Sequence, residues 1–414
     1  MTTTVENPDT LIREALFTPA GRRDPYPILS RLHHHGEAAR VSLGYTAVWG
    51  YEAVTGVLRT PGLWKTHPDY ELSTPHLKLT PYEVTALKEA SGNLPPWLVF
   101  SNPPYHTRAR RLVSKAFTPR RMEQMRERVE EEVTRLLDAI DPTRPVDIVD
   151  AVTAPLPQHV IGEIIGLTPE NSESFVRHAR EQGLLKDPNS TFEDKIARMR
   201  DRARWADEIR DLIAARRASA QDDVITALIE ATHDGDELTE PEMISLIMLL
   251  FAAGFDTSNN MLANGIYALL RHPDQMAELV DDPSLGRLVT EEVLRYDSPA
   301  FDTFYYAVGE QRIGDLVVPD GEPLELYLGI ANHDPKMFSD PGRFRIKRSD
   351  PAPVSFGAGA HLCLGISLAR LEGEALFSQL AKRFPDMRLA ENDPPRILDI
   401  AFRGFESMQV LLHP

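Results

Sequence analysis

Cysteine is nearly missing from this sequence, because among 414 residues there is one, Cys363. A single cysteine excludes a disulfide within the chain. Structural zinc sites use sets of cysteines and histidines at short, regular spacing, and we find no such set around it. A chain without disulfides is typical of a reducing cytoplasm. The sequence therefore predicts a cytoplasmic protein.

Long apolar segments are also scarce. The longest apolar run, from Ile244 to Phe255, is too short to span a bilayer. The N-terminal residues MTTTVENPDT lack the basic region and apolar core of a signal peptide. We therefore expect no membrane association.

Basic charge is in short supply, with 45 lysines and arginines against 62 aspartates and glutamates and a net charge of −17. This balance argues against nucleic-acid binding, which needs a basic surface. No Gly/Ser-rich linker, internal repeat or low-complexity run divides the chain, so we expect a single, mainly helical domain over residues 1–414. A glycine-rich motif for a flavin or a nicotinamide is not apparent either.

The most informative segment that the sequence does contain is SFGAGAHLCLG, from Ser355 to Gly365. The residues that follow have apolar side chains at helical spacing, which places Cys363 at or just before a helix N-terminus. The partial positive charge there lowers the pKa of a thiol and favours the metal-binding thiolate. A flat cofactor whose iron takes one axial sulfur fits best. The alternative is a buried structural cysteine beside a glycine turn.

The spacing of this segment resembles the haem-binding loop of the bacterial cytochromes P450, the haem-thiolate monooxygenases. The matching residues are Phe356, Gly357, Gly359, His361, Cys363 and Gly365. The resemblance implies haem b (iron protoporphyrin IX) with Cys363 as the axial iron ligand and His361 on a haem propionate. It implies cofactor contacts for Phe356, Gly357 and Gly365. The expected fold is mainly α with small β-sheets, with the haem between a long central helix and the cysteine loop.

A long helix is predicted to begin at the capping sequence Thr239-Glu240-Pro241-Glu242 and to end near Arg271, before His272-Pro273. Its middle is apolar on all sides and must be buried. Thr257 has one purely structural interpretation, in which its hydroxyl bonds back to the carbonyl of Ala253 and bends the helix. The segment Ala253 to Thr257 resembles the family's oxygen-binding helix. That resemblance implies that Ala253 and Gly254 contact the cofactor and that Asp256 and Thr257 deliver protons.

His106 and Arg110 lie four residues apart on a helix that is predicted to follow Pro103-Pro104, and therefore share one face. A solvated basic face is the alternative interpretation. In the resembled family this element supplies a histidine and an arginine to the haem propionates. The family's usual acidic pair near the two prolines is absent here, since Asn102 and Tyr105 stand in its place.

Further landmarks follow in the family's order. Glu292 and Arg295 match its structural E-x-x-R pair, and the segments 331–335 and 338–344 match its meander. In the strand after that pair, the family commonly has a propionate-binding arginine, and this chain has Tyr305. A phenol donates a hydrogen bond to a carboxylate but does not neutralise it.

The resemblance implies a cytoplasmic monooxygenase that inserts one atom of O2 into a mostly apolar small organic substrate. Ferredoxin and ferredoxin reductase would supply electrons, with docking through a basic patch comprising Arg108, Arg111, Lys115, Arg120 and Arg121. The pocket would be lined by Leu98, Val99, Phe100, Leu249, Ala253, Phe301, Phe304 and Phe402. Alternatives are a peroxide-driven or oxidative-coupling haem-thiolate enzyme and, from another class, a haem-based sensor or carrier.

Overall fold

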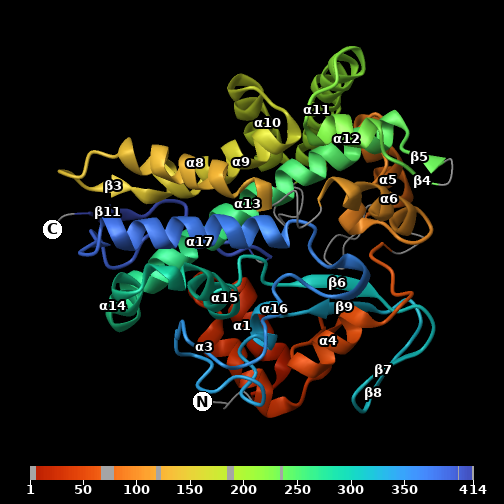
Figure 1. The fold of residues 1–414 in the computed structure, drawn as a ribbon. Helices are drawn as coiled ribbons and strands as arrows, with labels where there is room; N and C mark the ends of the chain where they lie inside the picture. Colours follow the sequence, from red (N-terminus) through yellow and green to blue (C-terminus); the bar gives the residue numbers. More distant parts are fainter. Residues whose placement is uncertain are drawn as a thin grey trace. The chain divides into compact units, whose positions relative to one another are not determined.

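The computed structural model describes residues 6–66, 79–117, 123–183, 191–233, 236–399 and 401–412 (Figure 1). Helices dominate and the sheets are small, as the sequence predicts. The chain divides into two compact units. The first comprises Met1–Leu63, Val129–Leu156 and Thr257–Pro414, and the second comprises Trp64–Arg128 and Pro157–Asp256. That residues 1–414 act as one domain stays a prediction.

The N-terminal part of the first unit packs short helices against a small sheet. Its helical elements are α1 (Pro8–Phe17), α2 (Pro19–Arg23), α3 (Tyr26–Leu29), η1 (Ser30–His35) and α4 (Tyr51–Arg59). A hairpin forms from β1 (Ala38–Val41) and β2 (Tyr45–Val48), with Gly44 at a φ of 91° in the turn. With β9 (Pro323–Leu326) and β6 (Thr303–Tyr306) it makes a four-stranded sheet in the order β1-β2-β9-β6. One face of this sheet buries an apolar cluster around Val54, Leu58, Leu324 and Leu326.

The rest of the first unit is built on a pair of packed helices, α15 (Gly286–Tyr296) and α17 (Ile366–Arg383). Its other helical elements are α8 (Arg126–Asp138), which begins in the second unit, η4 (Val149–Thr153), α14 (Pro273–Asp281), η6 (Pro283–Leu285), α16 (Leu328–Ala331) and η7 (Gly359–His361). The sheet β10-β11-β3 comprises Arg388–Leu389, Gln409–Leu411 and Val146–Asp147. A hairpin joins β7 (Gln311–Ile313) to β8 (Leu316–Val318).

The second unit is almost wholly helical. Its elements are α5 (Pro81–Ala90), η2 (Leu98–Phe100), α6 (Tyr105–Val113), η3 (Ser114–Ala116), α9 (Pro155–Ile165), α10 (Pro169–Gly183), α11 (Phe192–Ala218) and α12 (Val224–Ile229), with the strands β4 (Thr232–His233) and β5 (Asp236–Glu237). The long helix α11 packs against α5, α10 and α12. Phe175 and Phe251 meet edge to face at 5.2 Å between ring centroids.

Helix α13 (Glu240–Arg271) confirms the prediction of a long helix at both ends. The backbone N–H of Thr239 donates to Glu242 at 2.8 Å, and α14 begins at Pro273 directly after His272. At 1.5 Å per residue, its 32 residues extend about 48 Å. Among the described residues α13 alone is long and apolar enough to cross a membrane, but 67% of its most apolar window is buried, which is typical of a core helix.

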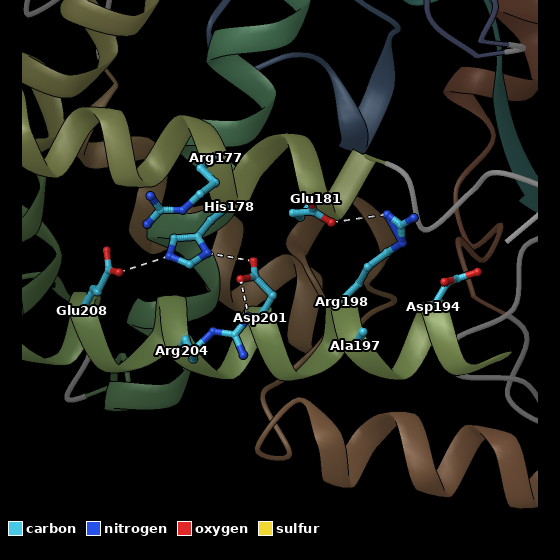
Figure 2. A pocket seen from close by; sticks show the side chains of 9 residues that line it. All are labelled: Arg177, His178, Glu181, Asp194, Ala197, Arg198, Asp201, Arg204 and Glu208. Carbon is cyan, nitrogen blue, oxygen red and sulfur yellow. Dashed lines mark hydrogen bonds and ion pairs between the residues drawn. The ribbon is translucent and has the colours of Figure 1, made fainter. Parts of the chain in front are cut away.

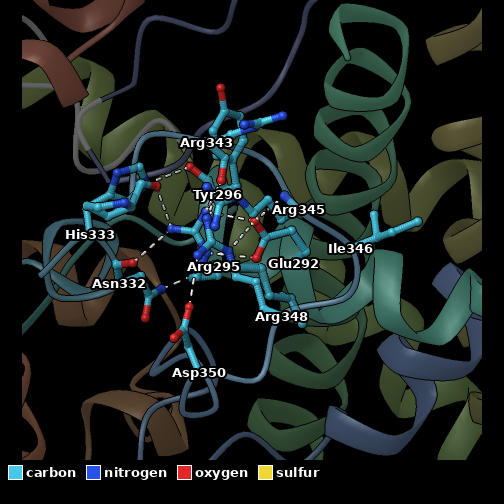
Figure 3. Close-up of polar contacts among 12 residues, drawn as sticks. Glu292, Arg295, Tyr296, Asn332, His333, Arg343, Arg345, Ile346, Arg348 and Asp350 are labelled. Atoms are coloured by element: carbon cyan, nitrogen blue, oxygen red, sulfur yellow. Dashed lines mark hydrogen bonds and ion pairs between the residues drawn. The ribbon is translucent and has the colours of Figure 1, made fainter. Parts of the chain in front are cut away.

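A buried ionic network joins α15 to the segment 332–350 (Figure 3). Arg295 donates two hydrogen bonds of 2.8 Å to Glu292, and it also donates to the carbonyls of Asn332 and Pro341. Arg348 donates a further hydrogen bond of 2.8 Å to Glu292. The Glu292 and Arg295 side chains are 3% and 2% exposed. The E-x-x-R pair is therefore structural, as predicted.

The same network holds the start of the cysteine loop. Asn332 accepts a hydrogen bond from the backbone N–H of Val354 and donates one to the hydroxyl of Ser355, both at 2.8 Å. The Ser355 hydroxyl donates in turn to the carbonyl of Leu294 in α15. Because these contacts are buried or partly buried and connect with one another, the loop begins from a rigid base.

Candidate active site

The cysteine loop closes on itself just before α17. The backbone N–H of Cys363 donates to the carbonyl of Phe356 at 3.0 Å, and that of Leu362 donates to Gly359 at 3.2 Å. Gly365 is the N-cap of α17, so Cys363 lies within reach of the positive end of the helix. The Cys363 side chain is partly exposed, unlike a structural cysteine, which is usually buried. This geometry suits a thiolate ligand.

Two glycines shape this loop. Gly357 and Gly359 have φ values of 67° and 66°, in the left-handed region that a side chain disfavours. A Cβ at Gly359 would in addition clash with the carbonyl oxygen of Leu58 in α4. The glycine spacing in the sequence therefore has a local steric reason in the fold.

Tyr305 lies next to His361. Their rings meet edge to face with centroids 5.9 Å apart and an interplanar angle of 77°. Tyr305 is 4% exposed, and burial raises the pKa of its phenol well above the ordinary value, so the hydroxyl keeps its proton. Strand β6 thus places Tyr305 beside the histidine of the cysteine loop, as expected if it takes the position of the family's arginine. Whether it reaches a propionate stays a prediction.

His106 and Arg110 lie on one face of α6, as their spacing predicts. His106 is 2% exposed, and burial together with the charges of Arg110 and Lys65 lowers its pKa to about 4. At neutral pH its imidazole is therefore uncharged. In this pair Arg110 supplies the positive charge, and His106 supplies a hydrogen-bonding group.

The burial of the polar residues varies along α13, and Ser258 and Asn260 are buried. Asp256 and Thr257 are intermediate in exposure, and Ala253 is exposed although Phe251 and Phe255 beside it are buried. A side chain at Gly254 would meet Ile161 of α9 at 3.2 Å, so glycine allows close helix packing there.

Glu372 of α17 is a residue that the sequence analysis missed. It is 1% exposed, it accepts a hydrogen bond from the hydroxyl of Ser258 of α13, and burial raises its pKa to about 8. Its carboxyl group is therefore mostly protonated at neutral pH. A glutamate within the apolar helical pattern of residues 366–383 is the signal that marks it.

The aromatic residues expected around the substrate differ in their surroundings. Phe301 is 1% exposed and packs edge to face on Tyr26 at 5.7 Å, so it belongs to the core of the first unit. Val99 in η2 is 37% exposed, and Leu98 is buried. The remaining pocket assignments stay predictions.

An open groove of about 480 Å³ lies between α10 and α11 (Figure 2). His178 is 3% exposed and bridges two carboxylates, with Asp201 at 2.7 Å and Glu208 at 3.1 Å. Arg204 pairs with the same Asp201 at 2.8 Å, and Arg198 pairs with Glu181 at 3.5 Å. These charges compensate one another within the groove.

Comparison with known proteins agrees with this geometry. The family profile described as "Cytochrome P450" matches residues 81–282 and 285–404. These features and matches define a haem-thiolate enzyme of helical architecture. The chain belongs to the cytochrome P450 family.

Curated relatives cover most of the chain. Cytochrome P450 107B1 of Saccharopolyspora erythraea is 39% identical over 77% of this chain and 78% of its own length. Cytochrome P450 monooxygenase PikC of Streptomyces venezuelae is 35% identical over 88% of this chain and 85% of its own. The solved structure of P450BioI with an acyl carrier protein has a TM-score of 0.85 and 31% identity, and covers 95% of this chain and 98% of the other.

The residues present fit the family's cofactor. The chain is a monooxygenase of haem-thiolate type, and its cofactor is haem b. Cys363 offers one soft sulfur donor, and Leu362 beside it is 39% exposed, an apolar surface that a flat ring would cover. Ala253 on α13 exposes a second apolar surface. Arg110 and His361 offer donors suited to carboxylates.

Proposed function

We propose that this protein inserts one oxygen atom from O2 into a mostly apolar small organic substrate, in the cytoplasm, with electrons from a ferredoxin and its reductase. The carrying observation is the lone Cys363 in a rigidly based glycine loop at the start of α17. Relatives named 6-deoxyerythronolide B hydroxylase and polyketide biosynthesis cytochrome P450 PksS support hydroxylation or epoxidation in biosynthetic tailoring.

Each site residue has a role in this proposal. Cys363 binds the iron, with Phe356, Gly357, Gly365, Ala253 and Gly254 along the ring, and His106, Arg110 and His361 at the propionates. When bound, the haem supplies the activation of O2. Arg110 brings a permanent positive charge to the propionates, and His106 brings a ring nitrogen that can donate a hydrogen bond. Tyr305 adds a protonated hydroxyl beside His361.

We assign proton supply to the three consecutive polar residues Asp256, Thr257 and Ser258 of α13. Asp256 and Thr257 are consecutive, and Ser258 follows with its hydrogen bond to Glu372. Because the Glu372 carboxyl stays protonated up to about pH 8, it can donate a proton to the hydroxyl group of Ser258, which adjoins Thr257 in the chain. In this proposal Thr257 passes the proton and Asp256 exchanges it with water.

The redox partner is assigned to a basic patch around α6. Ferredoxins are typically acidic, and attraction would act over about 10 Å at 0.1 M salt. The structure shows that Arg108 is engaged within the unit, with Asp236 at 3.0 Å and with Glu242. Arg111 is 47% exposed, and its nearest carboxylate is Asp236 at 3.8 Å, so it is the better candidate for docking. Arg120 and Arg121 lie outside the described residues.

The test compares two electron sources on one preparation. Turnover of a bound substrate with ferredoxin, reductase and O2 is expected to exceed turnover with hydrogen peroxide by at least an order of magnitude. Faster turnover with peroxide would assign the protein to the peroxide-driven class. Binding of O2 or CO without any turnover would point to a sensor or carrier.

A further inference from the structure

Arg202 of α11 is a buried cation without a carboxylate partner among the described residues. It is 8% exposed, and its one hydrogen-bond acceptor there is the carbonyl of Pro95, at 3.0 Å from Nη2. Its Nε is buried and donates to no atom of the described chain. Burial lowers its pKa to about 10, so the guanidinium remains charged at neutral pH. A buried charge is normally paired with an opposite charge, so we expect Arg202 to pair with a negatively charged group of a ligand.

The other arginines of the same helix show the contrast. Arg198 and Arg204 pair with Glu181 and Asp201 in the groove of Figure 2. Further along α11, Arg210 and Arg217 pair with Glu240, and Arg216 pairs with Asp223. Five of the other arginines of α11 thus pair with a carboxylate, although several of them are half exposed. Arg202, more deeply buried than most, meets none in the described part of the chain.

Two more buried donors lie beside Arg202. Its guanidinium carbon sits 5.6 Å from the centroid of the Trp97 ring, and Tyr105 is near enough to interact with it electrostatically. Trp97 Nε1 and the Tyr105 hydroxyl are both buried and have no hydrogen-bond partner among the described residues. Burial raises the pKa of Tyr105 to about 12, so the phenol also keeps its proton and can donate.

We propose that Arg202, Tyr105 and Trp97 form a subsite for a carboxylate on the substrate, so that the preferred substrates are organic acids with a largely apolar body. A carboxylate is acceptor-only, carries the opposite charge, and accepts hydrogen bonds from several donors at once. An apolar group leaves these buried donors unsatisfied. An ester carbonyl accepts weaker hydrogen bonds than a carboxylate does and brings no charge to pair with Arg202. This inference rests on the proposed oxygenase function and adds the substrate class.

The subsite lies near Ser245 of α13, and the residues proposed to act on oxygen, Asp256 and Thr257, lie further along the same helix. The carbonyl of Pro95, which Arg202 binds, also accepts a hydrogen bond of 3.0 Å from the hydroxyl of Ser245. Ser245, Leu249 and Ala253 recur every four residues and so share one side of α13, and the distance from Ser245 to Ala253 is about 12 Å along its axis. The proposed acid therefore presents carbons distant from its carboxylate to the exposed surface at Ala253.

A structural role for Arg202 is the competing explanation, because it clamps the segment before η2 to α11 through Pro95. Tyr105→Phe separates the two. Its hydroxyl bonds to no described residue, so its removal leaves the midpoint of thermal unfolding unchanged or slightly higher. On the proposal the same variant nevertheless loses several-fold in affinity for an acid.

The experiment measures calorimetric binding of decanoate and methyl decanoate to the holoenzyme. The wild type is expected to bind decanoate about tenfold tighter or more, and Arg202→Gln to lose this preference. Arg200→Gln, an exposed arginine of the same helix, makes the same charge change and is expected to keep the preference. Arg202→Lys restores part of it.

Equal affinity for acid and ester, or binding of neither, in the wild type overturns the subsite, which then holds water only. So does a Tyr105→Phe variant with unaltered acid affinity. The CO spectrum of the reduced protein is recorded on the same samples. A thiolate-type spectrum without acid preference overturns the subsite alone, whereas its absence overturns the proposed function.

Discussion

Two buried side chains, Glu372 and His106, have strongly shifted pKa values, and burial is the largest cause in each case. Glu372 is fully buried and has a hydroxyl as its hydrogen-bond partner, and its pKa therefore rises from 4.5 to about 8. His106 shows the opposite shift for the same reason, since burial disfavours the charged form of either group.

Glu372 gives the protein a pH-dependent stability. The unfolded chain releases this proton near pH 4.5 and the folded protein near pH 8, so the folded state binds more protons between these values. Its contribution is complete below pH 4.5 and falls by up to about 1.4 kcal/mol per pH unit as pH rises toward 8. Glu372→Gln should flatten this part of the curve and raise the unfolding temperature at pH 8. Thermal melts from pH 5 to 9 measure it.

The control for this prediction is Glu374→Gln, a half-buried glutamate of the same helix. Its melting curve should follow that of the wild type at each pH. If Glu372→Gln and the wild type differ by a constant amount across the whole range, Glu372 does not titrate in the folded protein as described.

Thr257→Ala is predicted to bind haem normally but to divert electrons from product into hydrogen peroxide. The hydroxyl follows Asp256 directly after the apolar part of α13, and its loss interrupts proton delivery. We expect the product formed per electron consumed to fall several-fold, and Thr257→Ser, which keeps the hydroxyl, to restore most of it. An unchanged ratio in Thr257→Ala would leave this residue as a bend in α13.

At the scale of elements, α15 and the segment 332–350 form a single electrostatic unit that carries the cysteine loop. Arg295→Met leaves Glu292 buried with fewer partners, and removing one member of a buried pair typically costs about 3–5 kcal/mol. The matched control is Lys347→Met, which breaks the exposed pair with Glu278 and should cost less than about 1 kcal/mol. Urea unfolding measures both. Equal losses would contradict the structural role of Arg295.

Some elements were predictable from sequence because their determinants are local. The ends of α13 follow from the Thr239–Glu242 cap and from His272-Pro273, and the β1-β2 turn follows from Gly44. The contact between Ser258 and Glu372 was not predictable, because it depends on how α17 packs on α13. The hydrogen bond from Arg348 to Glu292 was not predictable either, because the two residues lie 56 positions apart.

At the scale of the whole molecule, the net charge of −17 makes any local basic surface significant for an acidic redox partner. Arg111→Glu is predicted to slow reduction by ferredoxin several-fold at low salt. Added salt should slow the wild type in the same way and have a weaker effect on the variant. Stopped-flow reduction between 0.02 M and about 0.5 M salt covers the relevant screening range.

The control is Arg312→Glu, an exposed arginine of β7 with the same change of charge, which should leave reduction near the wild-type rate. Salt-independent reduction of the wild type would place docking on another face. The pairing of Arg108 with Glu242 already shows why sequence alone overestimates such a patch, since neighbouring carboxylates join it only in the folded unit.

The central claim is that Cys363 binds haem iron as a thiolate. The most direct measurement is the absorption spectrum of the reduced wild-type protein with carbon monoxide. We predict a Soret band with the red shift of a thiolate-ligated haem, and its loss in Cys363→Ala. A wild-type spectrum without that shift would contradict the account.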